Sequence, residues 1–369
     1  MRDVIVVGGG PAGSVTAMLL ARAGFDVELL ERAHFPRAKP CGDCLSPGAN
    51  RILKRVGLWR DVLALRPAKL HGWKLCFEEK NFSARFDDCI GDENAHIGLA
   101  VERERFDALL LQRARDAGVH VTHAHVTSVQ LDGQQQTVKG RDFTTHARFV
   151  VGADGLRSRV ARSLGAYSRT PRLKKHSLTI HVRGLQPMQL GEMRLQKDLC
   201  VGITPVESAT DGRFNITVVR TRAHGSPRES MRQALAEHDL AHLVSDEVEI
   251  LASGPFDWPT RQIVFKSAAL VGDAAGYYDP FTGQGIYQAL AGAELLATHL
   301  GNALRDSRQA SDELRQYARG QRAVTRPARR LQRAIEYFCA RRPLGRNAFA
   351  LLGRHPFFAQ RLIAATADV

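Results

Sequence analysis

Short apolar runs and glycine turns alternate at the start of the chain. Residues 4–7 are all apolar, which is typical of a strand buried on both faces of a parallel sheet. The glycine-rich residues 8–13 follow, and residues 15–23 have the spacing of a helix that ends at Gly24. Residues 25–30 then predict a second strand. This order of strand, turn, helix and strand predicts the first unit of a parallel α/β sheet.

Two later apolar runs each end in a turn that pairs an acidic residue with glycine. Residues 148–151 lead into Asp154-Gly155, and residues 268–271 lead into Gly272-Asp273. Each turn places a carboxylate or a backbone N–H group near any long ligand that crosses the sheet edge. An inward-facing helix is predicted over residues 285–304, where apolar side chains recur at helical spacing.

Between these runs the pattern changes to one rich in strands. Strand-like runs lie at 70–77, 82–86, 177–182, 199–203, 214–219 and 248–251, with one helix expected over 231–242. The sequence therefore predicts an α/β (α+β) protein with a Rossmann-like domain, an inserted sheet-rich substrate domain and a helical carboxyl-terminal segment. The expected boundaries are 1–70, 100–172 and 263–305 for the first domain, 71–99 and 173–262 for the substrate domain, and 306–369 for the helical segment.

Composition supports a folded globular chain. Of 369 residues, 44% are hydrophobic and 24% are charged, which excludes a disordered chain and a fibrous repeat. Six cysteines in a chain of this length fit a reducing compartment, so we expect a cytoplasmic location. The chain runs directly into its first strand, so no signal peptide is expected, and no apolar run reaches the length of a membrane span.

The positive charge is concentrated in the last part of the chain. The formal net charge is +14, and residues 301–369 hold 14 Arg, no Lys and five acidic residues. We expect a helix with Ser311 as its N-cap and an inward stripe of Leu331, Ile335 and Phe338. The basic face is either a solvated helical surface or a surface that meets an anionic membrane or a lipid-like substrate. No nucleic-acid partner is expected.

The first turn has the pattern of a dinucleotide-binding motif. Gly8, Gly10 and Gly13 follow a strand and open a helix, and Pro11 suits its first position. The glycines allow a tight turn, approach of a pyrophosphate to the backbone, and close packing of helix on strand. Glu31 ends the second strand, where a carboxylate accepts hydrogen bonds from a ribose diol. The two later acid–glycine turns favour FAD, whose ribityl chain and ring need contacts far from the pyrophosphate.

Several motifs resemble those of para-hydroxybenzoate-hydroxylase-type flavoproteins, and within them the geranylgeranyl reductase-like branch. Lys39-Pro40-Cys41-Gly42 resembles the cysteine loop of that branch, and residues 279–286 resemble its flavin-facing turn. Gly276 stands where hydroxylases usually have His. The residues Glu102-Arg103-x-x-Phe106-Asp107 also match.

The resemblance implies a set of FAD contacts. Arg103 is expected at the ribityl–phosphate region, Val126 at the adenine, Asp273 at the ribityl or pyrophosphate group, and the backbone of residues 283–286 at the ring, where its N–H groups stabilise the negative charge of reduced flavin. The complete expected set of cofactor-binding residues is Gly8, Gly10, Pro11, Ala12, Gly13, Glu31, Arg32, Cys41, Gly42, Arg103, Val126, Asp154, Gly155, Gly272, Asp273, Pro280, Gly283, Gly285 and Ile286.

One stretch departs from the branch. Residues 199–205 stand where the branch often has two aromatic residues, and here both are missing although Pro205 remains. The substrate therefore need not be an isoprenoid. The same stretch argues against a flavin-dependent halogenase, which would carry two Trp residues there.

Two side chains are candidates for catalysis. Cys41 is either a thiol that protonates a substrate carbon or tunes the flavin, or a small residue that packs the loop. A redox pair of Cys41 with Cys44 is a further alternative. Tyr278 or its neighbour Tyr277 either lines the substrate pocket or packs the turn. The other cysteines, Cys76, Cys89, Cys200 and Cys339, are expected to be ordinary thiols. The histidines show no metal-ligand spacing, so no metal site is expected.

The resulting hypothesis is an FAD-dependent oxidoreductase that transfers hydride or electrons between reduced flavin and a lipophilic, isoprenoid- or polyketide-like substrate. NAD(P)H is the expected electron donor, although no second nucleotide-binding motif distinguishes NADH, NADPH and a protein donor. The alternative is an FAD-dependent monooxygenase that hydroxylates an aromatic or polyketide-like molecule. A non-enzymatic FAD-binding or membrane-docking protein is a third possibility.

Overall fold

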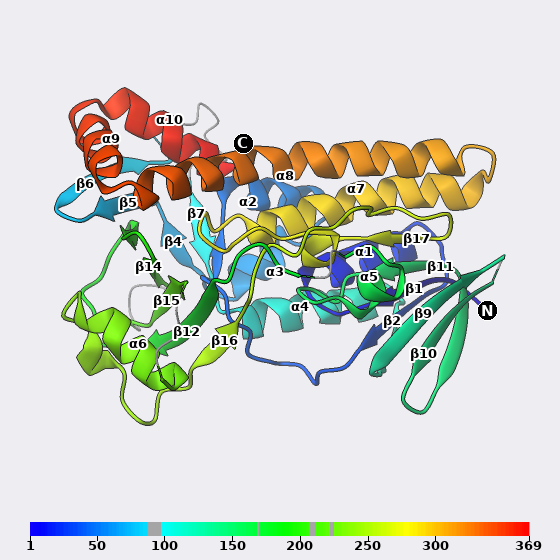
Figure 1. Ribbon diagram of the computed structural model, residues 1–369. Helices are drawn as coiled ribbons and strands as arrows, with labels where there is room; N and C mark the ends of the chain where they lie inside the picture. The colour runs from blue at the N-terminus through cyan, green and yellow to red at the C-terminus, as the bar shows by residue number, and fades with distance from the viewer. Residues whose placement is uncertain (88–96, 134, 168–169, 207–211, 222–224, 369) are drawn as a thin grey trace.

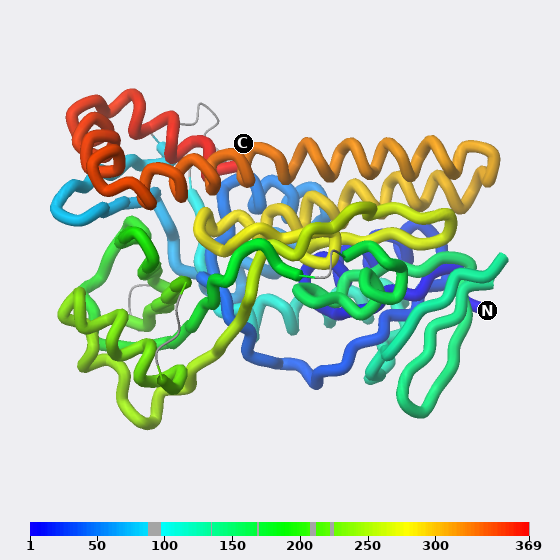
Figure 2. Tube along the Cα trace, in the orientation of Figure 1, coloured from blue at the N-terminus to red at the C-terminus, as the bar shows by residue number. Residues whose placement is uncertain are grey.

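Two β-sheets lie side by side under a pair of long helices in the computed structural model (Figure 1). The structure describes residues 1–87, 97–133, 135–167, 170–206, 212–221 and 225–368. The amino terminus lies at the outer end of the first sheet, while the last helices cover the second sheet (Figure 2). This mixed α/β architecture confirms the predicted fold class.

The first sheet is parallel at its centre and antiparallel at one side. Its strand order is β8-β2-β1-β11-β10-β9, and β17 pairs in parallel with β11. Val4 and Val6 face one side of β1, and Ile5 and Val7 face the other, and all four are buried because both faces are covered. The strands are β1 (Arg2–Val7), β2 (Val27–Glu31), β8 (His120–His123), β9 (Val126–Asp132), β10 (Gln135–Gly140), β11 (Thr144–Gly152) and β17 (Ala268–Leu270).

Helices cover this sheet and bridge to the second. α1 and α7 pack against each other on the face that Val4 and Val6 share, and α8 runs antiparallel to α7 (Figure 1). The helices are α1 (Pro11–Arg22), α2 (Pro47–Arg55), α3 (Trp59–Ala64), α4 (Arg103–Asp116), α5 (Arg159–Ser163), α6 (Pro227–Ala236), α7 (Gly285–Arg305), α8 (Ala310–Ala340), α9 (Arg342–Arg354) and α10 (Pro356–Ala367), with short 3₁₀ turns η1 (Ala241–Leu243) and η2 (Gly272–Ala275).

The second sheet joins two segments that are distant in the chain. Its order is β16-β12-β15-β14-β13-β5-β6, so the hairpin of residues 72–85 extends the sheet formed by residues 176–253. A small third sheet, β3-β7-β4, lies between the two larger ones. The strands are β3 (Cys44–Leu45), β4 (Ala68–Leu70), β5 (Gly72–Phe77), β6 (Lys80–Arg85), β7 (Gly98–Ala100), β12 (His176–Val182), β13 (Gly191–Leu195), β14 (Leu199–Pro205), β15 (Phe214–Arg220) and β16 (Leu251–Ser253).

Some predicted element boundaries were wrong. The helix expected over 231–242 begins at Pro227, because Ser226 and Glu229 form a capping box, and it ends at Ala236. The single strand expected over 70–77 is divided at His71, so that Leu70 pairs with β7 while Gly72 pairs with β6. The predicted domain boundaries remain a prediction.

The carboxyl-terminal helices differ in detail from the prediction. α8 begins after Gln309 rather than with Ser311 as its cap, and Phe338 is 39% exposed. Its buried face instead includes Ala328, Gln332 and Cys339. Of the predicted stripe, Ile335 packs against the core of the second sheet, whereas Phe338 faces solvent and Cys339 is buried in its place. In the described part of the chain, no helix is long and apolar enough to cross a membrane.

Tyr317 anchors α8 to the first sheet. Its side chain is fully buried, and its hydroxyl donates a hydrogen bond to the Leu270 carbonyl at 2.6 Å. We expect Tyr317→Phe to lower the free energy of unfolding by about 1–3 kcal/mol, because the buried carbonyl loses its partner. Urea unfolding measures this loss. Tyr337→Phe is the control, since Tyr337 is half-exposed and should change stability by less than about 0.5 kcal/mol. Equal effects of the two substitutions would contradict the prediction.

Candidate FAD and substrate site

The three glycines of the first turn have different roles. A Cβ atom on Gly13 would lie 1.9 Å from the Gly8 carbonyl oxygen, and one on Gly8 would lie 2.5 Å from the Ala153 oxygen. Gly8 also has φ of +107°, which favours glycine. At Gly10, however, the nearest protein atom to a Cβ would be 3.8 Å away. The fold thus needs Gly8 and Gly13, whereas Gly10 leaves open space where a pyrophosphate would approach.

Glu31 lies beside this turn, as its position after β2 predicts. One carboxylate oxygen accepts the Gly9 N–H at 2.6 Å, and the other accepts the Ala33 N–H at 2.8 Å. A carboxylate oxygen accepts more than one hydrogen bond, so the group keeps capacity for a ribose diol. Its neighbour Arg32 is exposed, and Val126 is buried at the start of β9.

A cavity with about 1320 Å³ of unfilled space, including its mouth, lies between the first sheet and the second. It is bounded by the glycine turn, the cysteine loop, the segment 272–289 and β14 and β15. The structure brings thirteen of the predicted cofactor residues together in its lining: Gly10, Pro11, Ala12, Cys41, Gly42, Arg103, Gly155, Gly272, Asp273, Pro280, Gly283, Gly285 and Ile286. Gly8, Gly13, Glu31, Arg32, Val126 and Asp154 lie outside the lining.

The Asp154 carboxylate is not directed at the cavity. It accepts a short hydrogen bond from the Ser158 hydroxyl and further bonds from the Arg159 N–H at 2.5 Å and the Val160 N–H at 3.3 Å. Asp154 therefore holds the start of α5, and only its neighbour Gly155 lines the cavity. The cofactor contact expected of Asp154 stays a prediction.

Positive charge exceeds negative charge next to the glycine turn. Arg103 makes two bonds to Asp107, at 2.6 and 2.7 Å, and Arg37 approaches the same carboxylate at 3.3 Å. Lys39 is near both, and burial together with Arg103 lowers its pKa. Asp107, Asp273 and Glu31 are the acids that act on these cations, and Arg32 adds a fourth positive charge. The residues present therefore fit a dianionic pyrophosphate at this position.

The start of α7 supplies further donors. Gly285 opens this 21-residue helix against the cavity, and no side chain of the described residues caps it. Its first N–H groups carry the positive end of the helix dipole. Gly283 adopts φ of +67° in the preceding turn. This end of the helix suits a ring that gains negative charge on reduction.

Three cysteines line the cavity. Cys41 and Cys44 both line the cavity, and Cys200, expected to be a buried or half-buried thiol, lines it from β14. Burial raises the pKa of the Cys41 thiol, and Arg103 only partly offsets this. Burial also raises the pKa values of Cys44 and Cys200. All three are therefore protonated at neutral pH. Cys89 lies outside the described residues.

Of the two tyrosines, Tyr277 lines the cavity and Tyr278 does not. The Tyr278 hydroxyl donates to Glu336 at 2.6 Å, on the far side of the turn. Lys175 joins this group, since its ammonium lies 2.8 Å from Glu336 and 3.0 Å from Asp279. Tyr277 is therefore the tyrosine at the cavity, and the catalytic role expected of Tyr278 stays a prediction.

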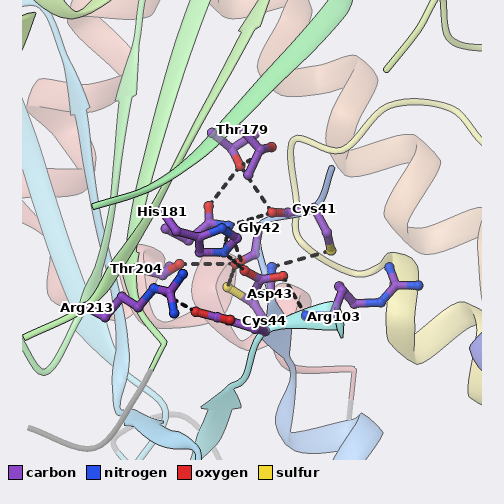
Figure 3. A network of polar contacts seen from close by, with 12 residues as sticks. Cys41, Gly42, Asp43, Cys44, Arg103, Thr179, His181, Thr204 and Arg213 are labelled. Atoms are coloured by element: carbon purple, nitrogen blue, oxygen red, sulfur yellow. Dashed lines mark hydrogen bonds and ion pairs between the residues drawn. The ribbon is translucent and has the colours of Figure 1, made fainter. Parts of the chain in front are cut away.

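A polar network under the cysteine loop was missed from the sequence (Figure 3). Asp43 is fully buried, and its carboxylate pairs with His181 at 2.6 Å and accepts from Asn215 at 2.8 Å. Thr204 donates to the Gly42 carbonyl at 3.1 Å. These partners come from β12, β14 and β15, so only the folded second sheet brings them to residues 41–44. Asp43, a polar residue between the two cysteines, was the one feature of the sequence that could have indicated this network.

The site defines a class of protein. A glycine turn at the carboxyl ends of parallel strands, cations beside it and a cavity that ends under a second sheet are the features of a two-domain flavoprotein enzyme. Residues 1–331 match the family model described as FAD binding domain, so the chain belongs to this family of FAD-binding proteins. It is an FAD-dependent oxidoreductase, as predicted.

The curated relatives are reductases. The chain is 29% identical over 335 residues to digeranylgeranylglycerophospholipid reductase 1 of Methanopyrus kandleri, covering 85% of this chain and 84% of the relative. It is 28% identical over 324 residues to menaquinone reductase of Mycobacterium tuberculosis, covering 80% and 75%. These relatives confirm the resemblance to the geranylgeranyl reductase-like branch.

Solved structures show the same fold at lower identity. The flavin-dependent brominase Bmp2 superposes with a TM-score of 0.82 at 19% identity, covering 100% of this chain and 93% of that one. The flavin-dependent halogenase CmlS gives a TM-score of 0.78 at 24% identity, covering 92% and 65%.

Two glycine substitutions separate cofactor binding from folding. Gly10→Ala should weaken FAD binding at least about tenfold and leave the stability of the apoprotein nearly unchanged, because the added methyl group meets only the cofactor. Gly13→Ala should lower both the affinity for FAD and the stability of the apoprotein, because its methyl group collides with the Gly8 carbonyl. Fluorescence titration with FAD and thermal unfolding of the apoproteins measure the two effects. A Gly10→Ala protein that binds FAD normally would contradict this assignment.

Proposed function

We propose that this protein uses reduced FAD to hydrogenate a carbon–carbon double bond of an elongated lipophilic substrate, such as a polyprenyl lipid or a prenylated quinone. The observation that carries this proposal is the shape of the cavity, which runs from the glycine turn to an apolar wall, with a second cavity on the other side of that wall. The names of the curated relatives support the substrate class.

The far wall of the cavity is apolar and is built mainly by the second sheet. Trp73, Met193 and Val219 come from β5, β13 and β15, and Phe256 and Phe281 come from the flanking loops. The stretch at β14 that lacks the branch's two aromatic residues contributes only Cys200, Gly202 and Thr204. Small residues at this position leave room for a chain beside the cofactor.

A second cavity of about 460 Å³ adjoins the first. Cys200, Val219 and Phe281 line both, so these three side chains form the partition between them. The second cavity lies between the β13–β14 turn and α8, where Ile335 and Cys339 contribute apolar surface. A compact aromatic substrate needs only the first cavity, whereas an extended chain uses both.

Reduced FAD supplies a hydride when bound, and the chain must supply the proton that completes the reduction. Cys41, Cys200 and Tyr277 line the cavity, and burial raises the pKa of each, so all are proton donors rather than bases at neutral pH. We propose Cys41 as the donor and NAD(P)H as the source of electrons. A cytoplasmic location belongs to the same proposal, since the cysteines in the described residues are free thiols.

The function is tested with chemically reduced holoprotein under anaerobic conditions. Mixing with polyprenyl compounds of several lengths should restore the oxidised flavin spectrum and give a product heavier by two hydrogen atoms. Cys41→Ser should slow this step by at least about a hundredfold if the thiol is the proton donor. Hydroxylated products formed only with oxygen would instead support the monooxygenase alternative.

A bulky side chain between the two cavities tests whether a long substrate occupies both. Cys200→Trp should abolish reduction of long substrates and retain reduction of short ones, because the indole would fill the space between the cavities. Cys200→Val is the matched control, since its side chain is apolar and similar in size, and it should behave like the wild type. The ratio of kcat/KM for long and short substrates is the measurement. An unchanged ratio in the Trp variant would contradict the proposed path.

The carboxyl-terminal helices form the surface that we propose meets an anionic membrane. Phe357 and Phe358 are 59% and 51% exposed, and Arg361 lies over the Phe357 ring at 5.4 Å. Apolar side chains surrounded by arginine suit an interface of acyl chains and anionic headgroups. The other exposed apolar residues of this surface are Tyr337, Phe338, Leu344 and Leu351.

Vesicle binding tests this surface. The protein should bind vesicles that contain phosphatidylglycerol, and salt should weaken binding by screening the arginines. A Phe357→Ser, Phe358→Ser double variant should bind at least about tenfold more weakly. Leu63→Ser is the control, because Leu63 is 44% exposed on α3, away from this surface. Equal binding by all three proteins would contradict the proposal.

A further inference from the structure

Asp43 occupies a backbone conformation that costs energy for its residue type. Its φ of +58° lies in the left-handed region, where glycine would be relaxed and aspartate is tolerated at a cost. The side chain is also fully buried. An aspartate at such a position indicates that its carboxylate is kept for the contacts it makes.

Those contacts join the cysteine loop to both sheets. One Asp43 oxygen accepts the Arg103 N–H at 3.3 Å, at the start of α4 in the first domain. The other pairs with the His181 Nε2 atom at 2.6 Å and accepts from Asn215 at 2.8 Å, both in the second sheet. The Asn215 amide also donates to the Cys41 carbonyl at 2.7 Å. Asp43 itself donates its N–H to the Cys41 sulfur at 3.4 Å.

One histidine pairs directly with this buried carboxylate. The Arg103 guanidinium is directed at Asp107, so among the described residues His181 is the basic side chain that contacts the Asp43 carboxylate. The other charged groups that act on His181 are Glu102 and Arg213, which pair with each other at 2.9 Å. Because Arg213 offsets Glu102, the Asp43 carboxylate is the main acidic group facing the ring.

We propose that Asp43 and His181 are a positioning pair that holds the Cys41 loop against the second sheet, and that this hold is weakened when His181 loses its proton. Resting on the proposed reductase function, this pair sets where the Cys41 thiol stands relative to the substrate. Neither residue lines the cavity, so both act through the loop. The pair therefore couples the geometry of the site to pH.

The direction of the pH effect follows from the local charges. Burial lowers the pKa of His181, but the hydrogen bond to Asp43 and its charge outweigh burial, so the pKa lies above its ordinary value. A histidine whose pKa is raised by folding adds stability below its unfolded pKa of about 6.5, and this stability is lost as the pH rises through the folded pKa. The loop should thus be held at pH 6 and loosened in mildly alkaline solution.

The first test needs no substrate. In the holoprotein, the visible spectrum and circular dichroism of bound FAD should change with pH as a single proton titration above about pH 6.5. His181→Gln and Asp43→Asn should abolish this change. The wild type should also unfold about 5 °C higher than His181→Gln near pH 6, and the gap should close as the pH rises. Thr217→Val removes neutral bonds only, to the Cys41 carbonyl, Asn215 and Thr179, and should leave the pH dependence intact.

A matched ion pair elsewhere serves as the control. His299 lies 2.7 Å from Glu313 between α7 and α8, and neither residue lines the cavity. His299→Gln should change stability without altering the flavin titration. If His181→Gln retains the wild-type titration, or if His299→Gln abolishes it, the proposal is overturned.

Activity distinguishes this inference from the proposed function. With a reducible substrate, the kcat of the wild type should fall over the pH range of the spectral titration, and His181→Gln should show a low kcat independent of pH. Reduction with the same pH profile in wild type and His181→Gln would overturn the inference alone. A spectral titration in a protein that reduces none of the tested substrates would instead overturn the proposed function and leave the positioning pair in place.

Discussion

Everything in the site depends on how closely α1 approaches the carboxyl ends of β1 and β11. That approach requires glycine at positions 8 and 13, because a single methyl group at Gly13 would overlap the Gly8 carbonyl. It brings the uncapped start of α1 to the sheet edge, where Arg37, Lys39 and Arg103 gather. The same close packing lets α7 lie directly on α1, so its amino-terminal end reaches the cavity as well.

The second constraint is the junction between the two sheets. The cysteine loop belongs to the first domain by sequence, yet its carbonyl groups accept hydrogen bonds from Thr204, Asn215 and Thr217 of the second. A short polar loop therefore lines the cavity and also joins the two sheets. A change in this loop would alter the cavity and the junction between the sheets together.

The sequence predicted what depends on local pattern. The first strands, the glycine turn and Glu31 follow from periodicity and spacing, and thirteen of the predicted cofactor residues do line one cavity. Features that depend on contacts between distant parts of the chain could not be predicted. His181 lies 138 positions from Asp43, and the 72–85 hairpin joins a sheet formed about a hundred residues later. Which of Tyr277 and Tyr278 lines the cavity could not be predicted either, because the two adjacent side chains point to opposite sides of a turn whose orientation only the folded structure shows.

The long helix α8 has a mechanical consequence. Its 31 residues span about 46 Å, with Tyr317 bonded to the first sheet and Cys339 packed into the core of the second. A helix anchored in both sheets opposes their separation. Pro327 lies between the two anchors and removes one backbone hydrogen bond there, so any bending of α8 is expected at that position.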